Sequence, residues 1–138
     1  FINKKKFNEI GGFDNNFFLY FEETDYCKRA SSRGLKAYQI NEIKVKTEGR
    51  SVLIKNKKEK KELNNILIWH FIWSKYYFTK KNYGLMLSLF IFFPTMIRIL
   101  FKIFIYKLID NKRIYERYKY RLNGLASSMV GKKSSLRL

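Results

Sequence analysis

Apolar and polar positions in the first third of the chain follow the pattern of a compact α/β unit. Residues 17–21 form a continuous apolar run of strand length, and the Gly11-Gly12 pair before it predicts a turn. Residues 36–40 and 43–47 indicate extended structure, because in the second of them apolar residues alternate with lysines as in a half-buried strand. We therefore expect strands in this region.

A helix is predicted between these strands, over residues 23–33. Its apolar residues recur at helical spacing, and Gly34 is suited to end it. Asp25 and Arg29 are four residues apart, so their side chains should lie on one helix face and form an ion pair.

The charge run at residues 55–62 separates this unit from a more apolar second part. The run is either a solvated connector or the start of a helix. Beyond it, aromatic and aliphatic residues of 63–78 recur every three or four positions, which predicts a helix. We expect three regions: 1–52, a connector at 53–62, and a basic, apolar helical region at 63–138.

The longest apolar run, residues 85–97, is shorter than the roughly 20 residues that a membrane-spanning helix needs. Extension to 85–109 reaches that length but includes charged residues, and Pro94 should break or kink the helix. We expect one or two helices that lie in the membrane interface, with a bilayer span or a core helix as alternatives. The three cations of the longer stretch, which can reach lipid headgroups, are Arg98, Lys102 and Lys107.

Charge restricts the kind of partner. The 138 residues contain 29 Lys and Arg against 11 Asp and Glu, a net charge of +18, and most of the excess follows residue 50. Such a balance indicates a polyanionic neighbour, which can be nucleic acid, an acidic lipid surface or a phosphorylated substrate. The apolar run favours the membrane, because it would have no purpose in a small nucleic-acid-binding protein. The single cysteine, Cys27, excludes an internal disulfide.

Three carboxylates, Glu22, Glu23 and Asp25, gather where the predicted helix begins. The free amides and dipole of a helix start stabilise negative charge, so acidic residues there often serve only to cap the helix. An ionised carboxylate in this place can also take a proton from an alcohol, which is the task of a general base.

The sequence from Gly11-Gly12-Phe13-Asp14 through the aromatic run to Phe21-Glu22-Glu23-Thr24-Asp25-Tyr26-Cys27-Lys28-Arg29 resembles the acceptor-side motif of family 2 glycosyltransferases, especially rhamnosyltransferase-like and galactosyltransferase-like members. The resemblance implies an α/β fold, namely the carboxy-terminal part of a GT-A domain, followed by membrane-proximal helices. It also implies an inverting transfer of a sugar from a nucleotide-sugar donor to a glycan or lipid-linked acceptor.

The same resemblance assigns roles to residues of the motif. Glu23 falls on the position of the base, where the family has Asp, and Glu22 on the Glu before it. Arg29 would support the helix through its pair with Asp25. The residues expected to bind the acceptor are Gly11, Gly12, Phe13, Asp14 and Asp25.

The chain departs from the family pattern in two places. Thr47 stands where many members have a metal-binding His, and no Asp-x-Asp occurs. We therefore expect no metal ligands in this chain, a Mg²⁺ or Mn²⁺ ion only in a full-length enzyme, and no activity of this part alone. The expected location is the cytoplasmic face of a bacterial inner membrane. The alternatives are a non-catalytic membrane-associated protein and, less favoured, a nucleic-acid-binding protein.

Overall fold

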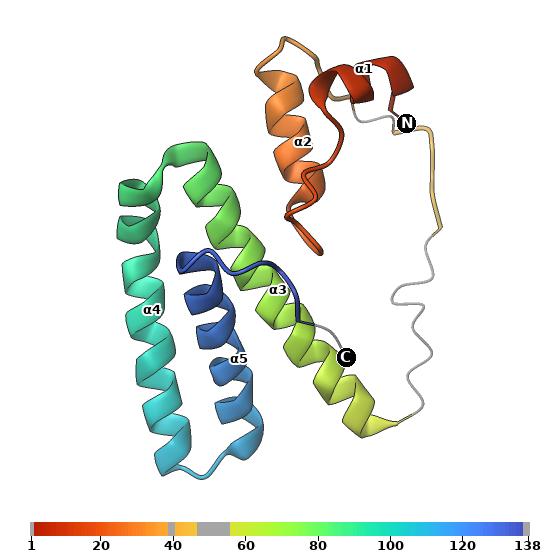
Figure 1. The fold of residues 1–138 in the computed structure, drawn as a ribbon. Coiled ribbons are helices and arrows are strands. Elements are labelled where there is room, and N and C mark those ends of the chain that lie inside the picture. Colours follow the sequence, from red (N-terminus) through yellow and green to blue (C-terminus); the bar gives the residue numbers. More distant parts are fainter. Residues whose placement is uncertain (1, 39–40, 47–55, 137–138) are drawn as a thin grey trace.

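The computed structural model describes residues 2–38, 41–46 and 56–136. In Figure 1, three long helices form a bundle, and a pair of short helices lies beside the carboxy-terminal end of the first long one. The five helices are α1 (Lys4–Ile10), α2 (Glu22–Ser31), α3 (Lys57–Tyr83), α4 (Leu85–Leu108) and α5 (Lys112–Met129).

Asparagines begin three of these helices. The side chains of Asn3, Asn56 and Asn111 each accept a hydrogen bond from the backbone amide three residues later, which satisfies one of the free amides of α1, α3 and α5. Gly84, with φ of 84°, separates α3 from α4, because an L side chain is strained in that conformation. The long helices therefore follow one another with short connections.

The core of the bundle lies where α3, α4 and α5 meet. Tyr76 packs its ring edge-on against Phe92, with the ring centroids 5.2 Å apart. A Cβ atom on Gly124 of α5 would lie 2.6 Å from the carbonyl oxygen of Trp69 on α3, so only glycine permits this close approach. The buried cluster consists of Ile72, Tyr76, Phe92, Ile99 and Leu125.

Residues after α5 cross over α3 and cover its only histidine. His70 is fully buried. Its Nδ1 lies 2.8 Å from the Ser134 hydroxyl, and its Nε2 lies 2.8 Å from the Leu136 carbonyl. Because a carbonyl only accepts, Nε2 carries a proton. His70 is thus part of the packing between the bundle and the end of the chain.

The predicted α/β fold is wrong. Within the described residues every regular element is a helix, and no strand or sheet is formed. The predicted strand at 17–21 is an irregular loop. The described parts of the other two, 36–38 and 43–46, have no strand partner, and Ile43 and Val45 are exposed. Residues 39–40 and 47 lie outside the described part.

The aromatic run at 17–21 packs on a helix in place of a sheet. The ring of Phe17 lies 4.9 Å from that of Tyr77, and the ring of Phe21 lies 5.4 Å from that of Phe78. An apolar run is satisfied by any apolar surface, whereas a strand also needs a neighbouring backbone to pair with. Here α3 supplies the surface, and the described residues supply no such backbone.

The helical expectations agree better with the structure. The helix expected at 23–33 is α2, although it ends at Ser31, three residues before Gly34. The charge run at 55–62 is mostly the beginning of α3, as the second interpretation of that run expected. The structure does not show the expected break at Pro94. Helix α4 continues through this exposed residue as one helix. The division into three regions stays a prediction.

Candidate functional site

The motif segment, residues 11–29, consists of a turn, the aromatic loop and most of α2. The loop enters α2 through Tyr20 and Phe21, which both have left-handed backbone conformations, with φ of 67° and 70°. Such conformations cost about 1–2 kcal/mol per residue and persist only where the surroundings impose them. Several contacts with α3 surround these two residues: the ring of Phe71 lies 5.5 Å from that of Tyr20 and 5.9 Å from that of Phe21, and the Ser74 hydroxyl donates to the Leu19 carbonyl at 2.7 Å.

Glu22 and Glu23 therefore follow a strained loop and begin α2. No side chain caps this helix start, and Phe21 occupies the N-cap position. Glu23 is exposed, whereas Glu22 is partly buried. One oxygen of Glu22 is inaccessible to solvent, and no described residue donates a hydrogen bond to it. Glu23 is thus the carboxylate of this helix start that an incoming hydroxyl can reach.

Asp25 has a different environment, because it is fully buried and bound by two cations. Arg29 Nε donates to its Oδ2 at 2.8 Å, and Lys81 Nζ lies 2.8 Å from its Oδ1. The same guanidinium donates to the carbonyls of Ile10 at 2.8 Å and Gly12 at 2.6 Å. The predicted Asp25–Arg29 pair is confirmed, and it joins α2 to the turn after α1.

Asp14 binds the same lysine. Its carboxylate accepts hydrogen bonds from Lys81 Nζ at 2.8 Å, from the Tyr77 hydroxyl at 3.1 Å, and from the backbone and side-chain amides of Asn16. Each carboxylate oxygen thus accepts two hydrogen bonds, which is as many as its lone pairs allow. Burial alone would raise the pKa of Asp14, but the bonds from Lys81 and Asn16 outweigh it and lower the pKa to about 2.

The Asp14 carboxylate also shifts the pKa values of Lys81 and Tyr77. Burial alone would lower the pKa of Lys81, but its bonds to Asp14 and Asp25 outweigh that effect and raise it. Burial raises the pKa of Tyr77, and the charge of Asp14 adds to the increase. Asp14, Asp25, Arg29 and Lys81 form an ion-pair network that fixes the motif segment to α3. We call it the Lys81 network.

The remaining motif residues form the turn that the sequence predicts. Gly11 and Gly12 both have positive φ, and Gly11 ends α1. Phe13 is 43% exposed, and its ring lies 5.6 Å from that of Tyr26 on α2. The expected acceptor-binding residues therefore lie together, but the carboxylates of Asp14 and Asp25 face partners within the chain.

The motif residues do not fit a divalent cation. Glu23 and Asp25 have the spacing of metal ligands, yet Asp25 is already paired with two cations. In the part of the chain that the structure describes, no three His, Cys, Asp or Glu side chains gather where an ion could be held. Thr47, at the family's His position, lies outside the described residues.

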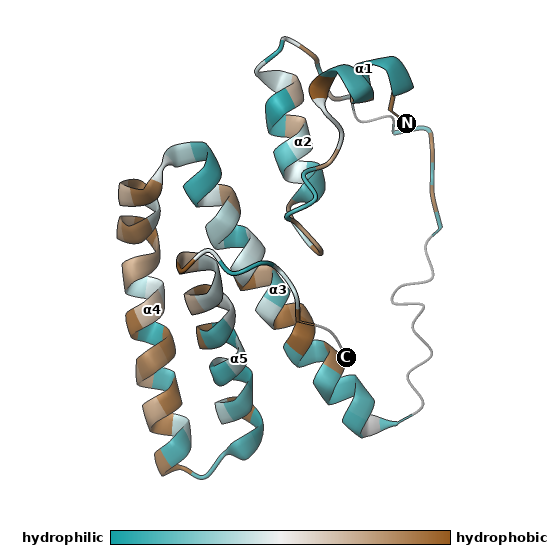
Figure 2. Cartoon of the chain, in the orientation of Figure 1, coloured by the Kyte–Doolittle hydropathy of each residue, from teal (hydrophilic) through white to brown (hydrophobic). Residues whose placement is uncertain are grey.

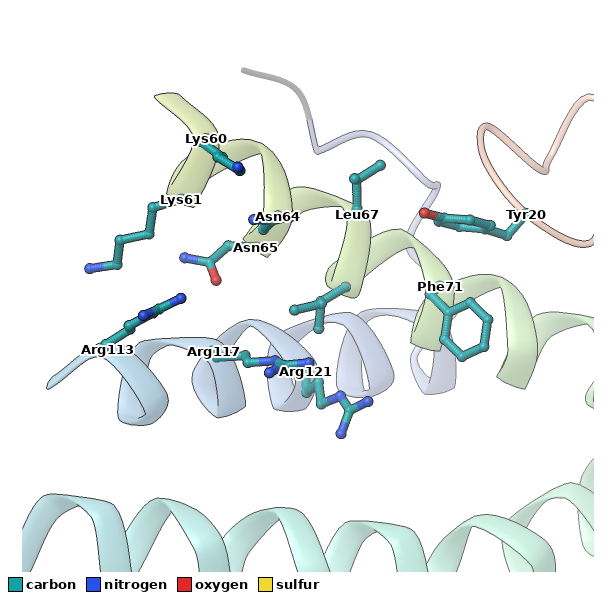
Figure 3. A pocket seen from close by; sticks show the side chains of 11 residues that line it. Tyr20, Lys60, Lys61, Asn64, Asn65, Leu67, Phe71, Arg113, Arg117 and Arg121 are labelled. Carbon is teal, nitrogen blue, oxygen red and sulfur yellow. The ribbon is translucent and has the colours of Figure 1, made fainter. Parts of the chain in front are cut away.

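A basic groove between α3 and α5 was not predicted. Figure 3 shows the side chains of both helices that face it, with Tyr20 of the motif segment at one end. Its volume is about 670 Å³. The arginines at 113, 117 and 121 recur every four residues, which was the available signal in the sequence. The α3–α5 groove is lined by Tyr20, Lys60, Lys61, Asn64, Asn65, Leu67, Ile68, Phe71, Arg113, Arg117 and Arg121.

Helix α4 has an exposed apolar face along its whole length. Figure 2 shows that α4 is mostly hydrophobic with a few hydrophilic bands, whereas α3 and α5 are more polar. By length and composition it is the one helix among the described residues that could cross a membrane. Seven side chains, each at least half exposed, recur every three or four residues and form the α4 stripe: Met86, Phe90, Phe93, Ile97, Phe101, Phe104 and Leu108.

Comparison of the chain with protein-family models, with curated proteins and with solved structures finds no match. A functional proposal therefore rests on the motif, the Lys81 network, the groove and the α4 stripe.

Proposed function

We propose that this chain is the acceptor-side and membrane-binding part of a family 2 glycosyltransferase that works at a membrane surface. The observation that carries the proposal is the Lys81 network. Lys81 Nζ is within 2.8 Å of both Asp14 and Asp25, so it fixes the helix start bearing Glu22 and Glu23 to α3. Because α3 packs on α4, the carboxylates are held at a set position relative to the α4 stripe.

In the proposed reaction Glu23 is the general base. Its carboxylate takes the proton of an acceptor hydroxyl as that oxygen attacks the anomeric carbon of the sugar. The new carbon–oxygen bond forms while the bond from the anomeric carbon to the donor phosphate breaks, and the nucleoside diphosphate leaves with its electron pair. The exposure of Glu23 supports this role. Glu22, with one buried oxygen, is better placed to shape the helix start.

The α4 stripe supports a membrane location for the reaction. Exposed apolar patches of this extent mark interaction surfaces, and seven large side chains without a charge among them match the interior of a bilayer. Arg98 and Lys107 are exposed on the same helix and can reach anionic headgroups.

The neighbours of α4 favour a helix that lies in the membrane plane. The ring of Tyr118 on α5 stacks on Tyr106 of α4 at 5.9 Å, and the Lys102 ammonium lies over the Tyr118 ring. If α4 crossed the bilayer, the basic helix α5 beside it would enter the hydrocarbon, where cations are costly. With α4 in the plane, α3 and α5 remain on the aqueous side, and the acceptor would be lipid-linked or held at the surface.

The test is turnover of a panel of nucleotide sugars by the full-length protein, with membrane extract as acceptor. Glu23→Gln keeps the shape of the side chain and removes the base, so we expect a loss of about a hundredfold or more. Glu62→Gln, a change at an exposed residue of α3, is the matched control and should retain full turnover. Equal rates for the wild type and Glu23→Gln would exclude Glu23 as the base.

A second candidate is a non-catalytic membrane-associated protein, which the α4 stripe favours because that surface needs no chemistry. This candidate predicts binding to anionic vesicles and no turnover by the full-length protein with any donor. Turnover that depends on Glu23 would exclude it.

A further inference from the structure

The α3–α5 groove is lined by several cations and by no acidic side chain of the described residues. Five cations line it: Lys60 and Lys61 from α3, and Arg113, Arg117 and Arg121 from α5. None of the five forms an ion pair with a carboxylate of the described residues, and no acidic residue lines the groove. Like charges brought together cost free energy, and an anion in the groove would offset that cost.

The arrangement of the cations favours phosphate over other anions. Arginines four residues apart on one helix face are about 6 Å apart along the axis, so the row from Arg113 to Arg121 covers about 12 Å. Guanidinium groups bind phosphate oxygens in pairs, which makes arginine the preferred residue for this anion. A row of this length exceeds one phosphate and suits two that are linked. In Figure 3, Lys61 extends from the opposite helix on the side of Arg113.

The other end of the groove differs in character. Leu67 and Phe71 of α3 lie there with Tyr20, away from Lys60 and Lys61 (Figure 3). The volume of about 670 Å³ is that of a small-molecule site. A groove of this size, with a cationic end and an apolar end, fits a small ligand.

We propose that the α3–α5 groove binds the linked phosphates of a small anionic ligand, either free in solution or presented as a lipid headgroup. The inference does not rest on the proposed transferase activity. It assigns the basic excess of α5 to a built site that is distinct from the carboxylates of α2.

The first experiment measures binding of pyrophosphate to the purified chain by calorimetry. The test variant combines Lys61→Gln, Arg113→Gln and Arg117→Gln, all at exposed positions. Arg121 is left in place because its guanidinium lies over the Tyr118 ring and contributes to packing. The control variant removes the same charge elsewhere, through the changes Lys5→Gln, Lys36→Gln and Lys44→Gln at exposed positions outside the groove.

We expect the groove variant to lose about tenfold or more in pyrophosphate affinity and the control less than about twofold. Circular dichroism of both variants verifies that the helices remain. Equal losses in the two variants would overturn the proposal, because net charge alone would then explain binding.

The second arm separates the two sources of the phosphate. Vesicles of phosphatidylcholine that contain cardiolipin, an anionic lipid whose headgroup links two phosphates through a glycerol, are compared with vesicles of phosphatidylcholine alone, for the same three proteins. Pyrophosphate binding that depends on the groove supports a soluble ligand. Dependence on the groove only for the anionic vesicles supports a headgroup. No dependence in either arm, or tighter groove-dependent binding of a single-stranded oligonucleotide than of pyrophosphate, would overturn the proposal.

Discussion

At the scale of single residues, Lys81 determines where the motif segment lies. Its ammonium bridges Asp14 and Asp25, of which Asp25 is fully buried and also paired with Arg29. A buried carboxylate is tolerated only with such partners, and removal of one leaves a charge that is poorly compensated. The orientation of Glu22 and Glu23 therefore depends on a residue of α3 outside the motif.

Replacement of Lys81 by Met is expected to lower the free energy of unfolding by about 2–4 kcal/mol, because Asp25 then keeps only Arg29 as a charged partner. The measurement is urea denaturation. Lys75→Met, at an exposed position of the same helix, is the control and should change stability little. Addition of Asp14→Asn to Lys81→Met should recover part of the loss, because Lys81 is the cation paired with the Asp14 carboxylate among the described residues. An unchanged midpoint for Lys81→Met would contradict the role of the network.

Asp14 gives the stability a defined pH dependence. Its pKa is lowered to about 2 from 3.8, so its contribution is complete above about pH 4 and is lost as the pH falls through that window. The contribution is at most about 2.5 kcal/mol. The wild type and Asp14→Asn should differ by that amount near pH 6 and converge toward about pH 2 in chemical denaturation. A difference that stays constant over this range would show that the carboxylate is not stabilised by its neighbours.

At the scale of elements, α4 differs from its neighbours because two of its faces are apolar. One face, with Phe92 and Ile99, is buried against α3 and α5. The other is the α4 stripe, which no described residue covers. A helix with apolar residues on two faces and cations only between them suits a site between a protein core and lipid.

The α4 stripe is tested by the double change Phe90→Ser and Phe101→Ser. Each inserted phenylalanine contributes about 1.5–3 kcal/mol, so vesicle binding should weaken by more than about tenfold. Both side chains are exposed, so the helical content should not change. The control is Ile43→Ser with Val45→Ser, which removes exposed apolar side chains far from α4 in sequence. Similar weakening by both pairs would mean that the stripe is not the membrane surface.

At the scale of the whole molecule, the packing of α4 in the bundle bears on whether this helix can span a bilayer or lies in its plane. A 24-residue helix is about 36 Å long, enough to cross a hydrocarbon core of about 30 Å. Length alone would thus allow a span. Under the proposed function the cations of α5 disfavour a span, because α5 packs beside α4 and would be carried into the lipid.

An in-plane α4 predicts that the residues before and after it lie on one side of the membrane. Cys27 is exposed and precedes α4, and a Lys112→Cys, Cys27→Ser variant places the only thiol after it. A membrane-impermeant maleimide should label both proteins from the same side of sealed vesicles. Detergent-solubilised samples verify that both thiols react. Labelling from opposite sides would show that α4 spans the bilayer.

The sequence by itself determined part of the helical structure, namely α2, α3 and α4, but not α1. Residues 63–78 carry apolar positions at helical spacing, residues 85–109 form a long apolar stretch, and Asp25 and Arg29 are four residues apart, so these helices and the ion pair are predictable from local sequence. The carboxylates at the start of α2 were also predictable, because their position next to the predicted helix start is a local property of the sequence. The motif and its resemblance are properties of the sequence alone.

The tertiary structure decided what the apolar loop and the distant charges contact. The run at 17–21 has the composition of a strand, but its partner is the aromatic face of α3, which local pattern does not specify. Lys81 lies 56 residues from Asp25, so no local spacing joins them. The α3–α5 groove likewise combines two helices and a loop. Such contacts depend on which surfaces meet in the folded chain, because side-chain packing and charge pairing act through space and are independent of position along the sequence.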